Sequence, residues 1–315
     1  MRKVRIAVVG AGFWGRNHVR VLSEIPEAEL VAVCDIDKQR ADALSEKYGL
    51  KSYDDSVKMY KNEELDAVTI CVWSSKLAEE SIKALKMGKH VFVEKPMASS
   101  VREAQRALNL AEAKNLKLQV GFIERFNPGV RRVKKAIDDG VIGSLVLATA
   151  RRVSKWPQRI GDVGVVRDTA IHDIDVMRFL FNEDPSTVYA SVGYLQHEKI
   201  EDYAQIMLTF SSGRSAFIEA NWLTPYKIRK LIVTGSEAII NLDYITQEMT
   251  IETSGQTLTP RYEWEEPLKL ELQHFVDCIL NDKKPLVSGI DGIKALKIAE
   301  AALKSASKGQ PIKIL

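Results

Sequence analysis

Three glycines near the N-terminus constrain the fold more than any other feature of the chain. Gly10, Gly12 and Gly15 form a G-x-G-x-x-G pattern that directly follows the apolar run Val4–Val9 and opens an amphipathic stretch. In this pattern the first glycine permits a tight turn, the second lets a ligand approach the backbone, and the third lets the helix pack closely on the strand. The spacing therefore predicts a strand, a turn and a helix, the repeating unit of a parallel sheet.

The remainder of the first ~120 residues continues this alternation. We expect strands over 30–34, 66–72, 90–93 and 118–121, separated by helices that include 37–48, 76–87 and 99–114. The strand candidates are almost continuously apolar, which is typical of strands buried on both faces. Residues 1–121 are therefore predicted to form an α/β Rossmann domain with a parallel sheet.

The pattern changes after Gly121. A helix is expected over 128–139, with Asn127 as its N-cap and Pro128 at its first position. A strand over 145–153 and a helix over 170–180 are followed by period-two strands at 188–196, 203–210, 215–223 and 230–234, and then by helices over 268–280 and 290–307. Because short turns join antiparallel neighbours, we predict a second, α+β domain over residues 122–315.

Composition excludes several classes of partner. The chain has 45 basic and 42 acidic residues, so its net charge of +3 favours neither nucleic acid nor an anionic membrane. No apolar stretch approaches the ~18 residues of a membrane span, and no signal peptide is visible. The three cysteines are scattered without metal-binding spacing. Free thiols indicate a reducing compartment, so a cytoplasmic protein without a metal is expected.

The glycine turn predicts a dinucleotide site. The N-terminus of the following helix offers free N–H groups to phosphates, with Phe13 and Trp14 in the same loop. Asp35 lies twenty residues after Gly15, at the end of the second strand. Its carboxylate would accept hydrogen bonds from ribose hydroxyls and repel a 2′-phosphate, which favours NAD over NADP.

Other readings of these residues stay open. Asp37 and Arg40 lie close to Asp35 and keep NADP open as the cofactor. The glycine turn could also exist without a ligand, and Asp35 could simply begin a helix. Val72, at the end of a neighbouring strand, is a further candidate for cofactor contact.

Two charged residues follow the strand over 90–93. Glu94 and Lys95 stand at its carboxyl end, where open α/β sheets bind ligands, and Pro96 stiffens the turn. A lysine ammonium next to a reacting hydroxyl would stabilise developing alkoxide charge. The alternative is a solvated charged loop.

A second pair of candidate catalytic residues is Asp168 and His172. They are four residues apart, so they share one face of the expected helix. An imidazole, whose ordinary pKa is about 6.5, can remove the proton of a secondary alcohol while the neighbouring carboxylate orients it. The alternative is a buried histidine with a satisfied hydrogen bond. Zinc is not expected, because the five histidines are spread out without supporting ligands.

Taken together, these motifs resemble the glucose-fructose oxidoreductase / inositol dehydrogenase / rhizopine-catabolism (Gfo/Idh/MocA) family. The resemblance spans nearly the whole chain and rests on residues 9–15, 33–35, 93–96, 121–128 and 168–175. It implies an NAD(P)-dependent sugar oxidoreductase whose second domain carries a large, open, mostly antiparallel sheet. In many members that sheet forms homodimers or homotetramers.

The resemblance also implies roles for single residues. Lys95 is expected to touch the substrate hydroxyl and the nicotinamide region, and Glu94 to lie near the nicotinamide. His172 is the expected acid/base, assisted by Asp168.

A narrower resemblance is to nucleotide-sugar 3-dehydrogenases. Residues 12–18, 124–128 and 157–165 look like enzymes that oxidise C3 of UDP-N-acetylglucosamine or its uronic acid. Guanidinium groups bind diphosphates bidentately. We therefore expect a basic cluster at the cleft entrance, formed by Arg125, Arg151, Arg152, Lys155 and Arg159, with Arg125, Asn127 and Arg159 as substrate ligands. The alternative is an ordinary solvated basic loop.

One stretch departs from the family pattern. Many members have Thr-Pro after the fourth strand and a histidine several residues on, whereas residues 71–77 here read CVWSSKL. Trp73 could stack on a ligand or fill the core. A UDP-sugar 3-dehydrogenase is the first hypothesis. A free polyol or sugar dehydrogenase, such as an inositol dehydrogenase, is the second, and a non-catalytic NAD(P)-binding regulator is the third.

Overall fold

The computed structural model describes residues 2–157 and 162–314 and shows two compact units. The N-terminal unit comprises Met1–Phe122 and Leu268–Ile293, and the C-terminal unit comprises Ile123–Pro267 and Lys294–Leu315. The chain therefore returns to the N-terminal unit near its end, a return that the predicted boundary after residue 121 does not include.

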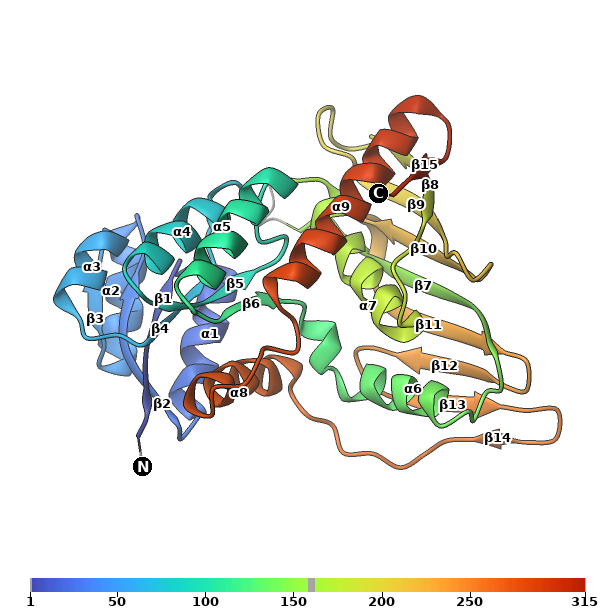
Figure 1. Cartoon of the computed structure of the whole chain (residues 1–315), viewed down its shortest axis with the longest axis horizontal. Helices are drawn as coiled ribbons and strands as arrows, with labels where there is room; N and C mark the ends of the chain where they lie inside the picture. The colour runs from blue at the N-terminus through green and yellow to red at the C-terminus, as the bar shows by residue number, and fades with distance from the viewer. Residues whose placement is uncertain (1, 158–161, 315) are drawn as a thin grey trace. The chain divides into compact units, whose positions relative to one another are not determined.

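The N-terminal unit is built on sheet A, whose six strands are all parallel (Figure 1). The strands are β1 (Val4–Val9), β2 (Ala28–Cys34), β3 (Lys51–Tyr53), β4 (Ala67–Ile70), β5 (His90–Glu94) and β6 (Leu118–Gly121). Their order, β3-β2-β1-β4-β5-β6, is that of dinucleotide-binding domains, in which ligands bind where the order reverses, here between β1 and β4. The predicted α/β class is confirmed.

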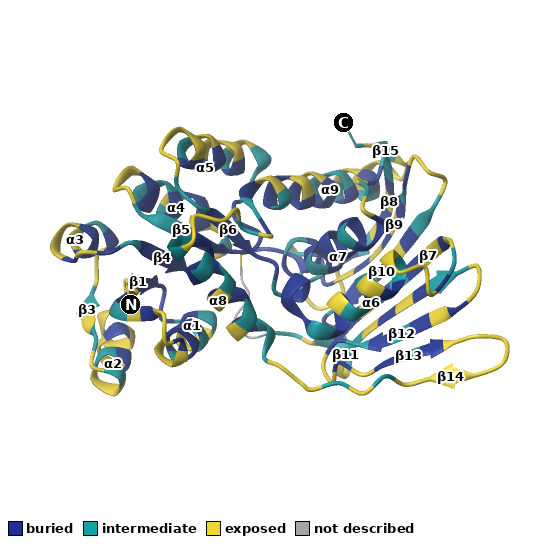
Figure 2. Ribbon diagram, turned by 60° about the horizontal axis from the view of Figure 1, so that its bottom comes forward, coloured by how far each residue is buried: buried dark blue, intermediate teal, exposed yellow. Residues whose placement is uncertain are grey.

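Helices cover this sheet. They are α1 (Phe13–Glu24), α2 (Lys38–Tyr48), α3 (Ser56–Asn62), α4 (Leu77–Lys86), α5 (Val101–Ala113) and α8 (Pro267–Leu280), with the short helix η1 (Ser74–Lys76) before α4. The side chains of Asp37, Asp55 and Ser100 accept hydrogen bonds from the first turns of α2, α3 and α5, so these helices begin where capping residues predict. Figure 2 shows the inner strands of sheet A, such as β1 and β4, almost entirely buried, whereas the edge strand β3 is not.

The C-terminal unit is built on sheet B, which has nine strands in the order β14-β13-β12-β11-β7-β10-β9-β8-β15. They are β7 (Leu145–Lys155), β8 (Thr187–Gly193), β9 (Tyr203–Thr209), β10 (Ser215–Asn221), β11 (Leu223–Gly235), β12 (Ile239–Asp243), β13 (Met249–Glu252), β14 (Thr257–Leu258) and β15 (Ile312–Lys313). The β7–β10 pair is parallel and the other pairs are antiparallel, which confirms the expected mostly antiparallel sheet.

Helices cover one face of sheet B. They include α6 (Pro128–Asp138), α7 (Ile171–Phe181), the short helices η2 (Ile123–Phe126) and η3 (Val166–Ala170), and the end of α9 (Gly289–Lys308). Ala216, Ile218 and Ala220 of β10 are buried on this face, whereas Phe217 points to the other face and is partly exposed. Figure 2 shows the resulting alternation of buried and exposed residues along the strands. Within the described ranges, no helix combines the length and apolarity needed to cross a membrane.

Candidate functional site

The glycine loop between β1 and α1 has the shape that its spacing predicts. Gly10 has a φ of +97°, and a Cβ there would lie 2.5 Å from the carbonyl oxygen of Cys71. At Gly15 a Cβ would lie 1.7 Å from the carbonyl oxygen of Gly10, so strand, turn and helix are in direct contact. At Gly12, by contrast, a Cβ would meet nothing within 4 Å. The backbone at Gly12 is therefore open to a ligand, as a pyrophosphate cradle requires.

Asp35 connects this loop to the end of β2. Its Oδ2 accepts a hydrogen bond from the backbone N–H of Ala11 at 2.6 Å, and its Oδ1 accepts one from Asp37 at 2.9 Å. Asp35 is half-buried, so the carboxylate is held at the carboxyl edge of the sheet next to the glycine turn. This is the location that a ribose-binding acid needs.

The other predicted cofactor residues line the same loops of the N-terminal unit. Phe13 is 64% exposed, and the partly buried Trp14 has an indole N–H without a hydrogen-bond partner in the described part of the chain. Val72 is half-buried, and its backbone nitrogen lies 3.0 Å from where a Cβ of Gly10 would be. Trp73 is 53% exposed, so it does not fill the core.

Glu94 is the last residue of β5 and Lys95 follows it, so both lie at the carboxyl end of this strand, and both are buried. The backbone N–H of Met97 donates to the carbonyl of Glu94 at 3.1 Å, which closes a turn around the cis Lys95–Pro96 bond. The carboxylate of Glu94 has a partner in α1, where Nε2 of the fully buried His18 lies 3.1 Å from Oε1 of Glu94.

His18 lies in the stretch 12–18 that carries the narrower resemblance, but it is not among the predicted site residues. Its position in α1, three residues after Gly15 and one before Val19, places it on the apolar face of that helix. A histidine on the apolar face of a helix is expected to be buried and therefore to need a hydrogen-bond partner. This expectation could have pointed to His18 from the sequence. Burial, with a smaller effect from Glu94, raises the pKa of the nearby Cys71 thiol well above its ordinary value.

Asp168 and His172 lie where one helix type gives way to another. Asp168 is in η3, a π-helical turn, and His172 is in the first turn of α7. The helix expected over 170–180 is α7, and Asp168 lies before it in a π-helical turn, a conformation that occurs often at functional sites. Asp168 is buried, whereas His172 is half-buried.

Hydrogen bonds fix the π-helical turn to sheet B. The hydroxyl of Thr169 donates to Oδ2 of Asp168 at 3.2 Å and accepts from the indole N–H of Trp222 at 2.8 Å. Trp222, directly after β10, is almost fully buried. The carboxylate of Asp168 is thus positioned by a chain of contacts that no sequence spacing indicates.

Arg125 was expected to bind the substrate, but in the structure it is paired with an aspartate of α7. Its Nε and Nη2 donate to the two carboxylate oxygens of Asp175, each at 2.7 Å, in a buried bidentate pair. The guanidinium also lies 5.1 Å from the centre of the Phe179 ring. These contacts connect η2 to α7, so the geometry gives Arg125 a structural role.

Asn127 is also occupied by structural contacts. Its Oδ1 accepts from the backbone of Gly129 at 2.9 Å, which confirms it as the N-cap of α6. Its amide nitrogen donates to Glu124 at 3.0 Å and to the carbonyl of Tyr244 at 2.9 Å. Arg159, the third expected substrate ligand, lies outside the described residues.

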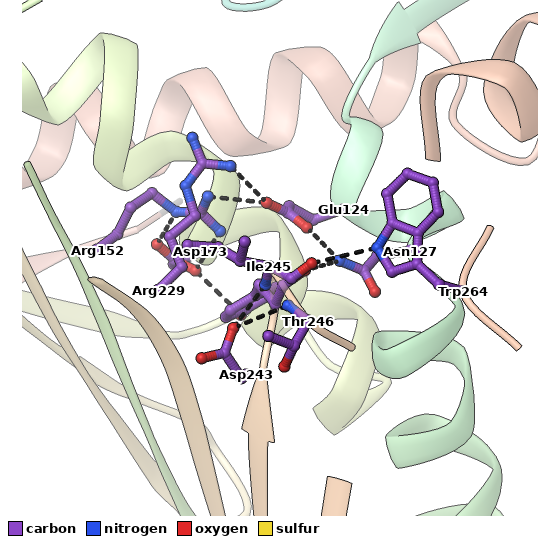
Figure 3. A network of polar contacts seen from close by, with 10 residues as sticks. Glu124, Asn127, Arg152, Asp173, Arg229, Asp243, Ile245, Thr246 and Trp264 are labelled. Atoms are coloured by element: carbon purple, nitrogen blue, oxygen red, sulfur yellow. Dashed lines mark hydrogen bonds and ion pairs between the residues drawn. The ribbon is translucent and has the colours of Figure 1, made fainter. Parts of the chain in front are cut away.

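The expected basic cluster does not form among the residues that the structure describes. Arg151 and Arg152 are neighbours on β7 and point to opposite faces: Arg151 is exposed and pairs with Glu219 at 3.1 Å, whereas Arg152 is buried. Arg152 donates to both oxygens of Asp173, at 2.7 and 3.0 Å, and to Glu124 at 2.8 Å (Figure 3). Successive residues of a strand alternate between faces, so adjacent arginines could not share an entrance.

Glu124, Arg152 and Asp173 form the centre of a buried charged network. Tyr244 donates its hydroxyl to Oδ1 of Asp173 at 3.0 Å, beneath the Arg152 guanidinium. Burial favours the neutral form of Glu124, yet Arg152 and Arg229 hold the pKa of Glu124 below its ordinary value. Arg229 and the neighbouring Lys227, which the sequence analysis also missed, lie on β11 at the edge of this network.

Comparison with known proteins identifies the family. Residues 4–122 match a family described as "Oxidoreductase family, NAD-binding Rossmann fold", and residues 130–241 match the GFO/IDH/MocA C-terminal domain. A scyllo-inositol 2-dehydrogenase (NAD(+)) of Bacillus subtilis (strain 168) is 30% identical, with 99% of this chain and 96% of that protein covered. This chain belongs to the GFO/IDH/MocA oxidoreductase family. The predicted resemblance and the NAD-binding Rossmann domain are thereby confirmed.

Further relatives of this GFO/IDH/MocA chain differ in their named substrates. An inositol 2-dehydrogenase of Rhizobium meliloti (strain 1021) is 31% identical, with 99% of each protein covered. The solved structure of a UDP-N-acetylglucosamine 3-dehydrogenase of Acidithiobacillus ferrooxidans has a TM-score of 0.89 at 22% identity, covering 98% of this chain and 99% of that one. At that identity the second similarity shows the fold alone.

Proposed function

We propose that this NAD-dependent oxidoreductase oxidises a secondary hydroxyl of a free polyol or sugar to a ketone. The observation that carries the proposal is similarity over 99% of the chain to enzymes named inositol 2-dehydrogenases. The chain also retains Lys95, Asp168 and His172, which a regulator without catalysis would not need. The second hypothesis of the sequence analysis is thus favoured over the first.

The UDP-sugar hypothesis loses part of its support from residues. Two of the guanidinium groups expected to bind a diphosphate, those of Arg125 and Arg152, are occupied by Asp175, Asp173 and Glu124. Arg151 faces away from Arg152 and pairs with Glu219.

NAD fits the residues of the glycine loop. The open backbone at Gly12 and the N-terminus of α1 would hold the pyrophosphate, and Asp35 would accept the ribose hydroxyls. Arg40, a residue that could bind a 2′-phosphate, pairs with Asp37 at 3.1 Å. The proposal is therefore NAD rather than NADP.

The chemistry divides between three side chains of this chain. When bound, NAD supplies the hydride acceptor, at C4 of the nicotinamide. His172 takes the hydroxyl proton as the C–H bond of the carbinol breaks, and later releases that proton to solvent. Asp168, held by Thr169, orients the imidazole. The Lys95 ammonium stabilises the developing alkoxide.

The test is NAD reduction, followed by absorbance, with a panel of substrates. We expect turnover with free polyols or sugars, represented by myo-inositol, scyllo-inositol, glucose and glucuronate, and a preference for NAD over NADP. Turnover with UDP-N-acetylglucosamine alone would restore the UDP-sugar hypothesis. Binding of NAD without turnover of any alcohol would favour the regulator.

We further propose that copies of the chain associate through the outer face of sheet B. Strand register places one row of side chains across five neighbouring strands of that face, namely Ile232, Thr149, Phe217, Met207 and Tyr189. The four large apolar members are 37–47% exposed. A contiguous apolar row of this kind is typical of a subunit interface.

A further inference from the structure

Two arginines lie opposite each other on neighbouring strands of sheet B. Arg229 of β11 is the direct register partner of Arg152 of β7, an arrangement in which like charges repel. The carboxylates of Asp173 and Glu124 form their shorter contacts with Arg152. Both oxygens of Asp173 accept from Arg152, and Oε1 of Glu124 lies 2.8 Å from Arg152 but 3.5 Å from Nη1 of Arg229. Arg229 therefore shares a carboxylate that is already bound to a closer cation.

Lys227 adds a second incompletely neutralised cation. It lies two residues before Arg229 in β11, where the register with β7 shifts between Leu223 and Ile228, and it is close enough for the two charges to interact. Lys227 is exposed, and no carboxylate of the described ranges lies within ion-pair distance of it.

The pKa values of Lys227 and Arg229 are both lowered, as expected for cations that lie near other cations. Arg229 is the main cause of the lowered pKa of Lys227, ahead of burial and Arg152. Burial, followed by Arg152, lowers the pKa of Arg229. Glu124, Asp173 and Asp168 act on Arg229 in the opposite direction, and Asp168 is the weakest of the three. Arg229 thus destabilises the charged form of Lys227, and Arg152 destabilises that of Arg229; a bound anion would relieve both effects.

The pair is accessible and belongs to the same unit as Asp168 and His172. The side chain of Arg229 is 35% exposed, so it can be reached from solvent. Asp168 is near enough to influence its pKa. Because a guanidinium can bind a carboxylate or phosphate with two parallel hydrogen bonds, Arg229 with Lys227 has the chemistry of an anion site.

We propose that Lys227 and Arg229 bind an anionic group, a carboxylate or a phosphate, carried by the sugar whose hydroxyl is oxidised. This inference rests on the proposed function and narrows it from sugars and polyols in general to acidic ones. The pair acts as a specificity determinant, because a neutral polyol would leave the repulsion between the two cations unrelieved.

The test measures binding and turnover separately. Calorimetry with the NADH-bound protein would compare glucuronate, glucose 6-phosphate and glucose. We expect one of the anionic sugars to bind about 10- to 100-fold more tightly than glucose, and added salt to reduce this preference. Comparison of glucuronate with glucose 6-phosphate distinguishes a carboxylate site from a phosphate site.

Substitutions of Lys227 and Arg229 test whether these two residues cause the preference for anionic sugars. Lys227→Met is expected to remove most of the anion preference while leaving glucose binding unchanged. Lys135→Met is the matched control, because Lys135 is an exposed lysine of α6 that pairs with Asp139. Arg229→Lys, which keeps the charge and loses the bidentate geometry, is expected to weaken anion binding less than Arg229→Met.

The outcomes separate the two proposals. A wild-type protein without preference for either anionic sugar, or a preference that survives in Lys227→Met and Arg229→Met, would overturn the inference. Anion preference in binding without turnover of any alcohol would support the inference and contradict the proposed dehydrogenase activity.

Discussion

At the scale of single residues, Gly12 and Gly15 differ in what an added methyl group would meet. Gly12 has a φ of −73°, which alanine also adopts, and open space beside it, whereas a Cβ at Gly15 would collide with the Gly10 carbonyl. We expect Gly12→Ala to keep the stability of the protein but weaken NAD binding by tenfold or more. Gly15→Ala is expected to lower the free energy of unfolding by about 2 kcal/mol or more. Chemical denaturation and NAD titration of both variants check this contrast.

Lys95 and His172 are predicted to act in the reaction rather than in cofactor binding. Lys95→Ala and His172→Ala are each expected to lower kcat by two or more orders of magnitude, because charge stabilisation and proton removal each contribute on that scale. NAD affinity, followed by quenching of tryptophan fluorescence, is expected to change little. Wild-type turnover in both variants would refute the assigned chemistry.

At the scale of elements, the buried network on Arg152 joins η2, β7 and α7. Arg152→Met would leave Glu124 and Asp173 buried without their cation, so we expect a loss of about 3–5 kcal/mol in the free energy of unfolding. Arg151→Met is the matched control from the adjacent residue, whose pair with Glu219 is largely exposed and is expected to contribute under about 1 kcal/mol. Equal effects of the two substitutions would contradict the network's role.

The same network predicts a dependence of stability on pH. Arg152 and Arg229 lower the pKa of Glu124 in the folded protein, so its contribution to stability is complete above the ordinary carboxyl value of 4.5 and is lost as pH falls through the folded pKa. Glu124→Gln is expected to flatten this acid dependence and to lower stability at neutral pH. Denaturant titrations of the wild type and the variant between pH 3 and pH 7 measure how the free energy of unfolding changes with pH. If this change is the same in both proteins, Glu124 is not its source.

At the scale of the whole molecule, the outer face of sheet B predicts self-association. Phe217→Lys, which places a charge in the middle of the apolar row, is expected to shift the protein toward monomer in light scattering at micromolar concentration. Val141→Lys is the control, because Val141 is an exposed apolar residue outside the sheet. A wild-type protein that is monomeric under the same conditions would remove this proposal.

Sequence patterns located most elements of both units but missed helix α3 and the strands β3, β12, β13, β14 and β15. Strands of two or three residues contain too few residues to show a hydrophobic period. The π-helical turn at Asp168 was missed as well, because its hydrogen bonds to Thr169 and Trp222 depend on a strand more than fifty residues away. Two members of the expected basic cluster, Arg125 and Arg152, are instead buried in ion pairs, because their partners come from another element, α7.

The sequence by itself determined the glycine turn, the acid at the end of β2 and the parallel sheet that carries them, since turns, caps and hydrophobic periods depend on residues near one another in the chain. Only the tertiary structure decided which cations are neutralised. Arg152 meets carboxylates 28 and 21 residues away, whereas Arg229 on the neighbouring strand only shares Glu124 with Arg152, and Lys227 has no carboxylate within ion-pair distance in the described ranges. Ion pairing requires contact in space, and residues far apart in sequence reach that contact only after the sheet has formed.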